Sequence, residues 1–287
     1  METPAQPPHD PASPNPASQN TPSAKSNNND EARGPRFREI PLRLMIPNLI
    51  TVLAICAGLT GIRLAFEGRY ELAVAMVLLA AFLDGIDGRV ARLLKATSSF
   101  GVQMDSLADI INFGVAPALV SYAFLLDGAH SMGWIACLLY AIAAGLRLAR
   151  FNVMAERDVK APWQSEFFVG VPAPMGAMLV MLPVYLGFLG VQPSPFFVYA
   201  SVAYTLLIGF LLVSRLPVWS GKAGKIRRDL MLPVLLVAVL YVALLMSYTW
   251  EILSVTVVAY LCILPFSARA WQRRFGTITI EDESTHV

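Results

Sequence analysis

Four aspartates occur as two close pairs in one short stretch of the chain, "DGIDGRVARLLKATSSFGVQMDSLAD", residues 84–109. Asp84 and Asp87 are three residues apart and Asp105 and Asp109 are four apart, so on helices each pair would share one face. The segment between the pairs is long enough to reverse the chain and bring them together. Four carboxylates in a partly dehydrated pocket repel one another unless a cation lies between them. Oxygen ligands favour Mg²⁺ or Mn²⁺, and no Cys or His lies near enough in sequence to suggest zinc.

The sequence therefore predicts a site for one or two divalent ions, which could also hold a substrate diphosphate. Small residues around the carboxylates leave room for a bulky anionic group, at positions where glycine costs a helix about 1 kcal/mol. These residues are Gly85, Gly88, Ala91 and Gly101. Cationic and hydroxyl side chains follow at positions suited to phosphate oxygens: Arg92, Lys95, Ser98 and Ser99.

Other interpretations of the aspartates account for less of the pattern. Solvated helix-end charges would explain Lys95 and Arg89, but Asp84 and Asp109 lie toward apolar sides of their helices, where a carboxylate costs several kcal/mol. A secondary transporter could couple ions through intramembrane aspartates, but the glycine spacing is then unexplained and no convincing internal repeat is present. A non-catalytic membrane scaffold gives no reason to keep the carboxylates.

The elements that carry these residues must lie in a bilayer. Of the 287 residues, 56% are hydrophobic and 15% are charged, and the mean hydropathy is +0.56, which is too apolar for an ordinary soluble domain. A spanning helix needs about 20 mostly apolar residues. Hydropathy predicts about eight such helices, at 44–66, 71–94, 105–126, 131–153, 171–190, 195–214, 229–247 and 249–268. The predicted fold is an all-α, polytopic membrane helical bundle.

The distribution of Lys and Arg predicts the orientation of this bundle. These residues concentrate before the first span and after the second, fourth, sixth and eighth spans, whereas the opposite connections carry few. Because Lys and Arg are retained on the cytoplasmic side, both termini and the aspartates are expected to be cytoplasmic.

The first 35 residues are rich in Pro, Ser and Asn and lack the apolar region of a signal peptide, which predicts a disordered tail over 1–38. Widely separated cysteines in apolar surroundings are expected to be small core or lipid-facing residues: Cys56, Cys137 and Cys262.

The full pattern resembles a known family signature. It runs Asp84, two residues, Asp87-Gly88, two residues, Ala91-Arg92, eight residues, Gly101, three residues, Asp105, three residues, Asp109. This is similar to the signature of the CDP-alcohol phosphatidyltransferases, integral-membrane enzymes that join a CDP-linked lipid or alcohol to an acceptor hydroxyl. The resemblance implies a six-helix catalytic core, here 39–214, usually dimeric and with a polar cavity open to the cytoplasm. A basic loop (215–228), two additional membrane helices (229–270) and a cytoplasmic tail (271–287) would follow.

The resemblance also implies roles for individual residues. Asp84, Asp87 and Asp105 would be metal ligands, and Asp109 would complete the metal site and act as the general base. Positions that contact the CDP-lipid head group in the family correspond here to Gly88, Arg92 and Ser98. The segment "IPNLIT" resembles the one that closes over the same diphosphate, through Pro47, Asn48 and Thr51, although Asn48 could instead cap the first helix.

Three further segments resemble the membrane-embedded bacterial and archaeal phosphatidylserine synthases: "IPNLITVLAICAG" (46–58), "GLRLARFN" (145–152) and "FFVGVPAPMGA" (167–177). They cover the first five spans in order, whereas the last three spans look like generic apolar sequence. The resemblance implies transfer of a phosphatidyl group from CDP-diacylglycerol to L-serine with release of CMP, in a bacterial inner membrane. Choline, glycerol 3-phosphate and inositol phosphate remain alternative acceptors.

An acceptor site for serine must hold a carboxylate and an ammonium group. Arg147 and Arg150 are three residues apart at the end of the fourth span and could bind the carboxylate. They could equally be topology anchors whose side chains reach the membrane surface. Glu166 could meet the ammonium group or be a solvated loop charge. Pro172 and Pro174 are expected to shape the entry to the fifth span.

Overall fold

The computed structural model of the chain describes residues 42–95, 98–155, 167–214, 217–219 and 231–275. The chain divides into residues 1–39 and residues 40–287, and every described element belongs to the second unit. The predicted N-terminal tail, Glu166 and most of the basic loop and C-terminal tail lie outside the described residues.

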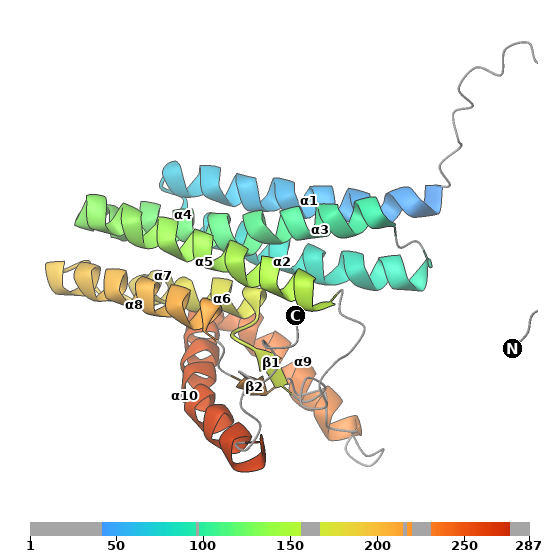
Figure 1. The fold of residues 1–287 in the computed structure, drawn as a ribbon. Helices are drawn as coiled ribbons and strands as arrows, with labels where there is room; N and C mark the ends of the chain where they lie inside the picture. Colours follow the sequence, from blue (N-terminus) through green and yellow to red (C-terminus); the bar gives the residue numbers. More distant parts are fainter. Residues whose placement is uncertain (1–41, 96–97, 156–166, 215–216, 220–230, 276–287) are drawn as a thin grey trace, which may run out of the picture. The chain divides into compact units, whose positions relative to one another are not determined.

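The first two predicted spans are helices, α1 (Leu42–Phe66) and α2 (Tyr70–Leu93), and they form an antiparallel hairpin. Gly68 makes the turn between them with a φ of 76°, a conformation that favours glycine. Gly61 lets the helices approach closely, because an added Cβ would lie 3.0 Å from the carbonyl oxygen of Ala73. The hairpin therefore holds the α2 aspartates beside the start of α1 (Figure 1).

The third predicted span is a continuous helical segment with a change of pitch. It consists of α3 (Ser99–Asp109), the π-helix η1 (Ile110–Val115) and α4 (Ala116–Phe124). It begins at Ser99, before the predicted start at 105, because the Ser98 hydroxyl caps it by accepting a 3.0 Å hydrogen bond from the Gly101 N–H. The wider π-helical turns start directly after Asp109 and are often found at functional sites.

The next elements complete the main body of the bundle. A short 3₁₀ helix, η2 (Leu126–Ala129), leads into α5 (Ser131–Ala155), which packs along α8 (Pro195–Val213) (Figure 1). The predicted span at 171–190 is instead two short helices, α6 (Ala173–Val180) and α7 (Leu182–Phe188). The break falls at Met181, because Pro183 lies in the first turn of α7 and has no N–H to continue α6. Pro172 caps α6 and Pro174 lies in its first turn, which confirms their expected role at the entry.

Two three-residue strands were not predicted. β1 (Phe167–Val169) pairs antiparallel with β2 (Pro217–Trp219), with Phe168 opposite Val218. This small sheet ties the segment before α6 to the segment after α8. Gly170 follows β1 with a φ of 76° and turns the chain toward α6.

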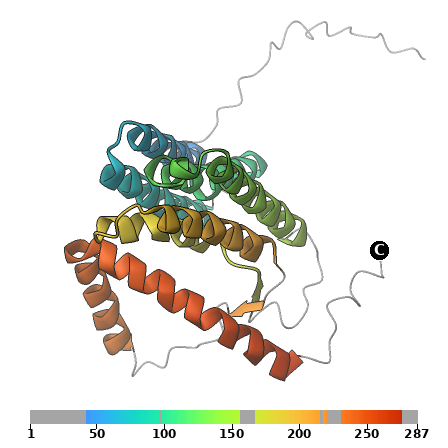
Figure 2. The same cartoon turned by 90° about the vertical axis from the view of Figure 1, so that its left-hand side faces the viewer.

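The last two helices are α9 (Met231–Ser247) and α10 (Thr249–Phe275). No residue of α9 is buried, whereas α10 packs Leu253 and Val257 into the main core. Trp250 anchors its start by stacking on Tyr185 and contacting Phe188, both of α7. In Figure 1 α10 runs at a steep angle to α1, α5 and α8, and in Figure 2 it lies on the side of α8 away from α1.

The described elements are helical apart from the two short strands, so the predicted all-α membrane bundle is confirmed. By length and composition, five of the described helical segments could cross a membrane: Met45–Phe66, Ser99–Phe124, Ser131–Met154, Pro195–Val213 and Thr249–Ser267. Among the rest, α2 carries several charges, α9 has 17 residues, and α6 and α7 are each short. The chain is thus a multi-pass membrane protein, and the number of eight spans stays a prediction.

Candidate active site

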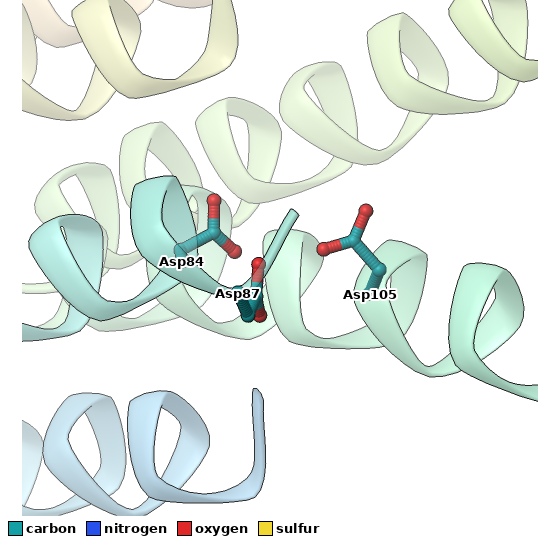
Figure 3. A group of neighbouring side chains, drawn as sticks. All are labelled: Asp84, Asp87 and Asp105. Carbon is teal, nitrogen blue, oxygen red and sulfur yellow. The ribbon is translucent and has the colours of Figure 1, made fainter. Parts of the chain in front are cut away.

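Three of the four predicted aspartates meet between α2 and α3. One carboxylate oxygen from each of Asp84, Asp87 and Asp105 lies within 4.8 Å of the other two. Figure 3 shows Asp87 between the other two side chains, with Asp84 on α2 and Asp105 on the facing helix α3. The three- and four-residue spacings therefore place these side chains as the sequence predicts.

Two oxygens of this cluster are buried without a hydrogen-bond partner among the described residues, Asp84 Oδ1 and Asp87 Oδ1. Asp87 is only 2% exposed, and its other oxygen accepts a 2.7 Å hydrogen bond from the Thr51 hydroxyl of α1. Within the described part of the chain, no Lys or Arg forms an ion pair with the cluster. A buried, unpaired carboxylate is costly, and a cation held between such oxygens removes that cost. The three residues thus fit a hard divalent ion such as Mg²⁺ or Mn²⁺.

Asp109 lies beside this cluster, at the last position of α3 before the π-helix. Its carboxyl group lies against that of Asp84 and within electrostatic range of the Arg147 guanidinium on α5. Two carboxyl groups in contact need a shared proton or a cation between them. Asp109 does not belong to the group of three that meets the 4.8 Å condition, so its predicted part as a fourth ligand and as a base stays a prediction.

Two members of the cluster, Asp87 and Asp105, line a pocket of about 420 Å³. All six residues predicted to contact the CDP-lipid line this pocket, together with small and acidic neighbours. The lining consists of Pro47, Asn48, Thr51, Asp87, Gly88, Ala91, Arg92, Ser98, Gly101, Val102 and Asp105. The pocket thus joins the start of α1, the end of α2 and the start of α3.

Glycines keep this pocket open. A Cβ added at Gly88 would meet nothing within 4 Å, so the backbone there is accessible to a large group. At Gly101 an added Cβ would lie 2.9 Å from Asn48 Oδ1, so only glycine allows α1 and α3 to meet here without displacement. Arg92 donates through Nε to the Gly88 carbonyl oxygen at 3.1 Å, which leaves its two terminal amino groups for a ligand.

Three expectations for neighbouring residues need correction or qualification. Asn48 does not cap the first helix, because α1 begins at Leu42. Lys95 does not line the pocket; it follows α2 with a φ of 49° in the left-handed region that commonly ends a helix. Ser99 is likewise absent from the lining, since Ser98 occupies the capping position that faces it.

Arg147 and Arg150 also lie outside that lining, on the Asp109 side of the acidic cluster. Arg147 donates through Nε to the main-chain carbonyl oxygen of Val171, just after Gly170. Arg150 has a buried Nη1 atom with no hydrogen-bond partner among the described residues. The end of α5 is held against α3 by a 2.9 Å hydrogen bond from Asn152 Nδ2 to Ser106 Oγ. Sequence reasoning missed the Val171 carbonyl, because a main-chain acceptor leaves no side-chain signal.

We expect Gly170→Ala to impair the site through Arg147. The substitution forces alanine into a left-handed conformation, with its Cβ 2.9 Å from the Ser214 carbonyl oxygen and 3.0 Å from that of Leu212. Such strain costs about 1–3 kcal/mol and moves the Val171 carbonyl that holds Arg147. Thermal unfolding of the purified protein should start at lower temperature, and turnover should fall.

Gly145→Ala is the matched control, because its Cβ meets nothing within 4 Å and alanine favours a helix. Equal unfolding temperatures for the two variants would contradict this account.

Comparison with known proteins assigns the family. The family model described as CDP-alcohol phosphatidyltransferase matches residues 44–213, and a second, CDP-alcohol phosphatidyltransferase 2, matches residues 229–265. The chain belongs to the CDP-alcohol phosphatidyltransferase family. It is therefore a membrane transferase of phospholipid biosynthesis. The match to residues 229–265 corrects the view that the last helices are generic apolar sequence.

Similar curated proteins carry one name, CDP-diacylglycerol--serine O-phosphatidyltransferase. The protein of Mycobacterium leprae is 40% identical over 81% of this chain and 77% of its own length. That of Mycobacterium tuberculosis (strain ATCC 25618 / H37Rv) is 39% identical over 82% of each chain. That of Helicobacter pylori (strain ATCC 700392 / 26695) is 35% identical over 76% of this chain and 88% of its own length.

Proposed function

We propose that this chain transfers the phosphatidyl group of CDP-diacylglycerol to the hydroxyl group of L-serine and releases CMP. The observation that carries the proposal is the acidic cluster at one wall of an open pocket, in a chain 35–40% identical to relatives named for this reaction. The pocket supports binding of the nucleotide diphosphate, and the Asp109 side supports binding of the acceptor.

The pocket residues would bind and orient the CDP part of the lipid. The free amino groups of Arg92 are suited to diphosphate oxygens, and the open backbone at Gly88 admits them. Pro47, Asn48 and Thr51 would close the site from α1, and Ser98 from the start of α3. Thr51 has a second task, since its hydroxyl fixes the Asp87 carboxylate in place.

Asp84, Asp87 and Asp105 would hold the divalent cation, with Asp109 as a further ligand; two ions of Mg²⁺ or Mn²⁺ are proposed. When bound, the cation supplies positive charge that stabilises the diphosphate and the departing CMP. The orphaned oxygens of Asp84 and Asp87 support this assignment.

Asp109 would act as general base. Its carboxylate takes the proton of the serine hydroxyl, and the serine oxygen forms a bond to the phosphorus that carries the diacylglycerol oxygen. The bond from that phosphorus to the oxygen of CMP breaks, and CMP leaves with the electron pair. The Arg147 guanidinium lies within electrostatic range of this base. Arg147 and Arg150 would also hold the serine carboxylate, and the unpartnered Arg150 Nη1 supports this role.

The setting of the site is part of the proposal. We expect the protein in a bacterial inner membrane, with both termini and the active site facing the cytoplasm, because Lys and Arg concentrate at that end of the predicted spans. Serine would then arrive from water while the acyl chains stay in lipid. A homodimer, a catalytic core at 39–214 and two added helices at 229–270 are further expectations from the family resemblance.

A parallel acceptor assay tests the reaction. Purified protein is given CDP-diacylglycerol and Mg²⁺ or Mn²⁺ with serine, glycerol 3-phosphate, inositol phosphate or choline, and released CMP is measured. We expect CMP release with serine to exceed that with each other acceptor by at least about 100-fold. A site built to bind a carboxylate leaves its own buried polar groups unpaired when the acceptor has no carboxylate. Release with another acceptor alone would overturn serine as the acceptor and leave the family assignment intact.

A further inference from the structure

The inner face of α10 carries a polar group that the acidic motif does not include. Leu253, Val257, Tyr260 and Leu264 recur at helical spacing and pack against the main core. The Tyr260 hydroxyl oxygen is buried on this face and has no hydrogen-bond partner among the described residues. A buried hydroxyl without a partner is unfavourable, so a ligand that pairs with it gains binding energy.

The position of α10 brings this hydroxyl within electrostatic range of a cationic side chain of α5. α10 contacts α6, α7 and β2, on the side of the bundle away from α1 (Figures 1 and 2). Tyr260 lies within electrostatic range of the Arg147 guanidinium, which in turn lies within electrostatic range of Asp109 and Arg150. None of these four residues lines the pocket assigned to the CDP-lipid. Polar groups of α3, α5 and α10 therefore gather on the far side of the acidic cluster.

The unpaired atoms of this group have a common chemistry. Arg150 Nη1 and the Tyr260 hydroxyl are both buried hydrogen-bond donors without partners, and Arg147 uses only its Nε in the bond to Val171. Several donors, two of them cationic, suit the two oxygens of a carboxylate. Asp109, which also lies within electrostatic range of Arg147, would then face a hydroxyl on the same small molecule. An amino acid with a short hydroxyl side chain offers both groups.

We infer that Tyr260 of α10 is an acceptor-binding residue, whose hydroxyl donates to the carboxylate of the amino-acid acceptor beside Arg147. This inference rests on the proposed serine transfer and deepens it, because it makes the C-terminal helix pair part of the acceptor site. It gives a physical role to residues 229–265, which lie outside the helices that carry the acidic motif. α9 would serve mainly to return the chain into the membrane so that α10 reaches this position.

Steady-state kinetics of Tyr260→Phe tests the inference. The variant removes one oxygen and keeps the ring that packs against the core. We expect the KM for serine to rise about tenfold or more, with kcat and the KM for CDP-diacylglycerol within about twofold of the wild type, because the lost bond is made to the acceptor alone. Tyr241→Phe is the matched control; its exposed hydroxyl on α9 already has a partner, Thr256 Oγ1 of α10 at 3.0 Å.

The outcomes separate this inference from the proposed function. A wild-type protein that releases no CMP with serine contradicts the proposed function itself. A wild-type protein active on serine, with Tyr260→Phe unchanged in its KM for serine, overturns the role of Tyr260 alone. A Tyr260→Phe variant that loses affinity for both substrates together, or unfolds at lower temperature than Tyr241→Phe, shows a structural role and also overturns the inference.

Discussion

Asp109→Asn should reduce turnover by roughly 10³-fold while the protein still inserts into the membrane and binds CDP-diacylglycerol. A positioned general base contributes about 10²–10⁴-fold to rate, and an amide of the same shape cannot take the serine proton. Asp109 is the aspartate best placed for this task, because it lies beside the group of three and toward Arg147. Asp109 is also the last residue of α3, directly before the π-helix η1, a kind of turn often found at functional sites.

CMP release measures the loss, and binding of a CDP-diacylglycerol analogue measures what remains. The control is Asp127→Asn, an aspartate in the η2 helix whose carboxylate accepts a 2.9 Å hydrogen bond from the Tyr122 hydroxyl. This control should keep wild-type turnover. Residual activity of Asp109→Asn above about a tenth of the wild type would remove Asp109 from the role of base.

The position of the acidic cluster could be predicted from the sequence because it depends on local rules. The spacing of Asp84 and Asp87 fixes one helix face, and the hairpin of α2 and α3 needs only a short reversal between them. The pocket residues of α1 were found through resemblance, since nothing in "IPNLIT" alone specifies that Thr51 donates to Asp87 across 36 positions of sequence. The spacing of residues along a helix shows which of them share a face, but it does not show which helix that face contacts.

Other parts of the site could not be predicted because they depend on the main chain or on distant packing. Strands of three residues such as β1 and β2 are too short for a period-two pattern to show. The bond from Arg147 to the Val171 carbonyl needs the turn at Gly170, whose left-handed conformation follows only from the folded positions of β1 and α8. Tyr260 is one aromatic residue on an apolar helix, and only the folded position of α10 brings it within electrostatic range of Arg147.

Removal of the divalent cation should abolish turnover, and Asp87→Asn should do so even with metal present. The cation supplies several kcal/mol of charge stabilisation, and about 1.4 kcal/mol corresponds to a tenfold change in rate, so a loss of at least about 10²-fold is expected. Asp87 is the most informative ligand to change, because it is buried, shares the cluster with Asp84 and Asp105, and lines the pocket. Glu71→Gln in the first turn of the same helix is the control and should retain wild-type activity.

Thermal unfolding with Mn²⁺ or with a chelator separates metal binding from catalysis. With Mn²⁺ the wild-type protein should unfold at higher temperature than Asp87→Asn, because ligand binding to the folded state stabilises it. With a chelator the order should reverse. The wild-type cluster then buries unpaired carboxylates that repel one another, and an amide at position 87 removes one of those charges while its oxygen can still accept from Thr51. A wild-type protein that keeps its activity in the chelator, or an Asp87→Asn variant with the same metal-dependent stabilisation as the wild type, would contradict the cation site. The reversal requires that the clustered carboxylates are unfavourable without a cation and favourable with one, which distinguishes a metal site from aspartates that are merely solvated at the ends of two helices.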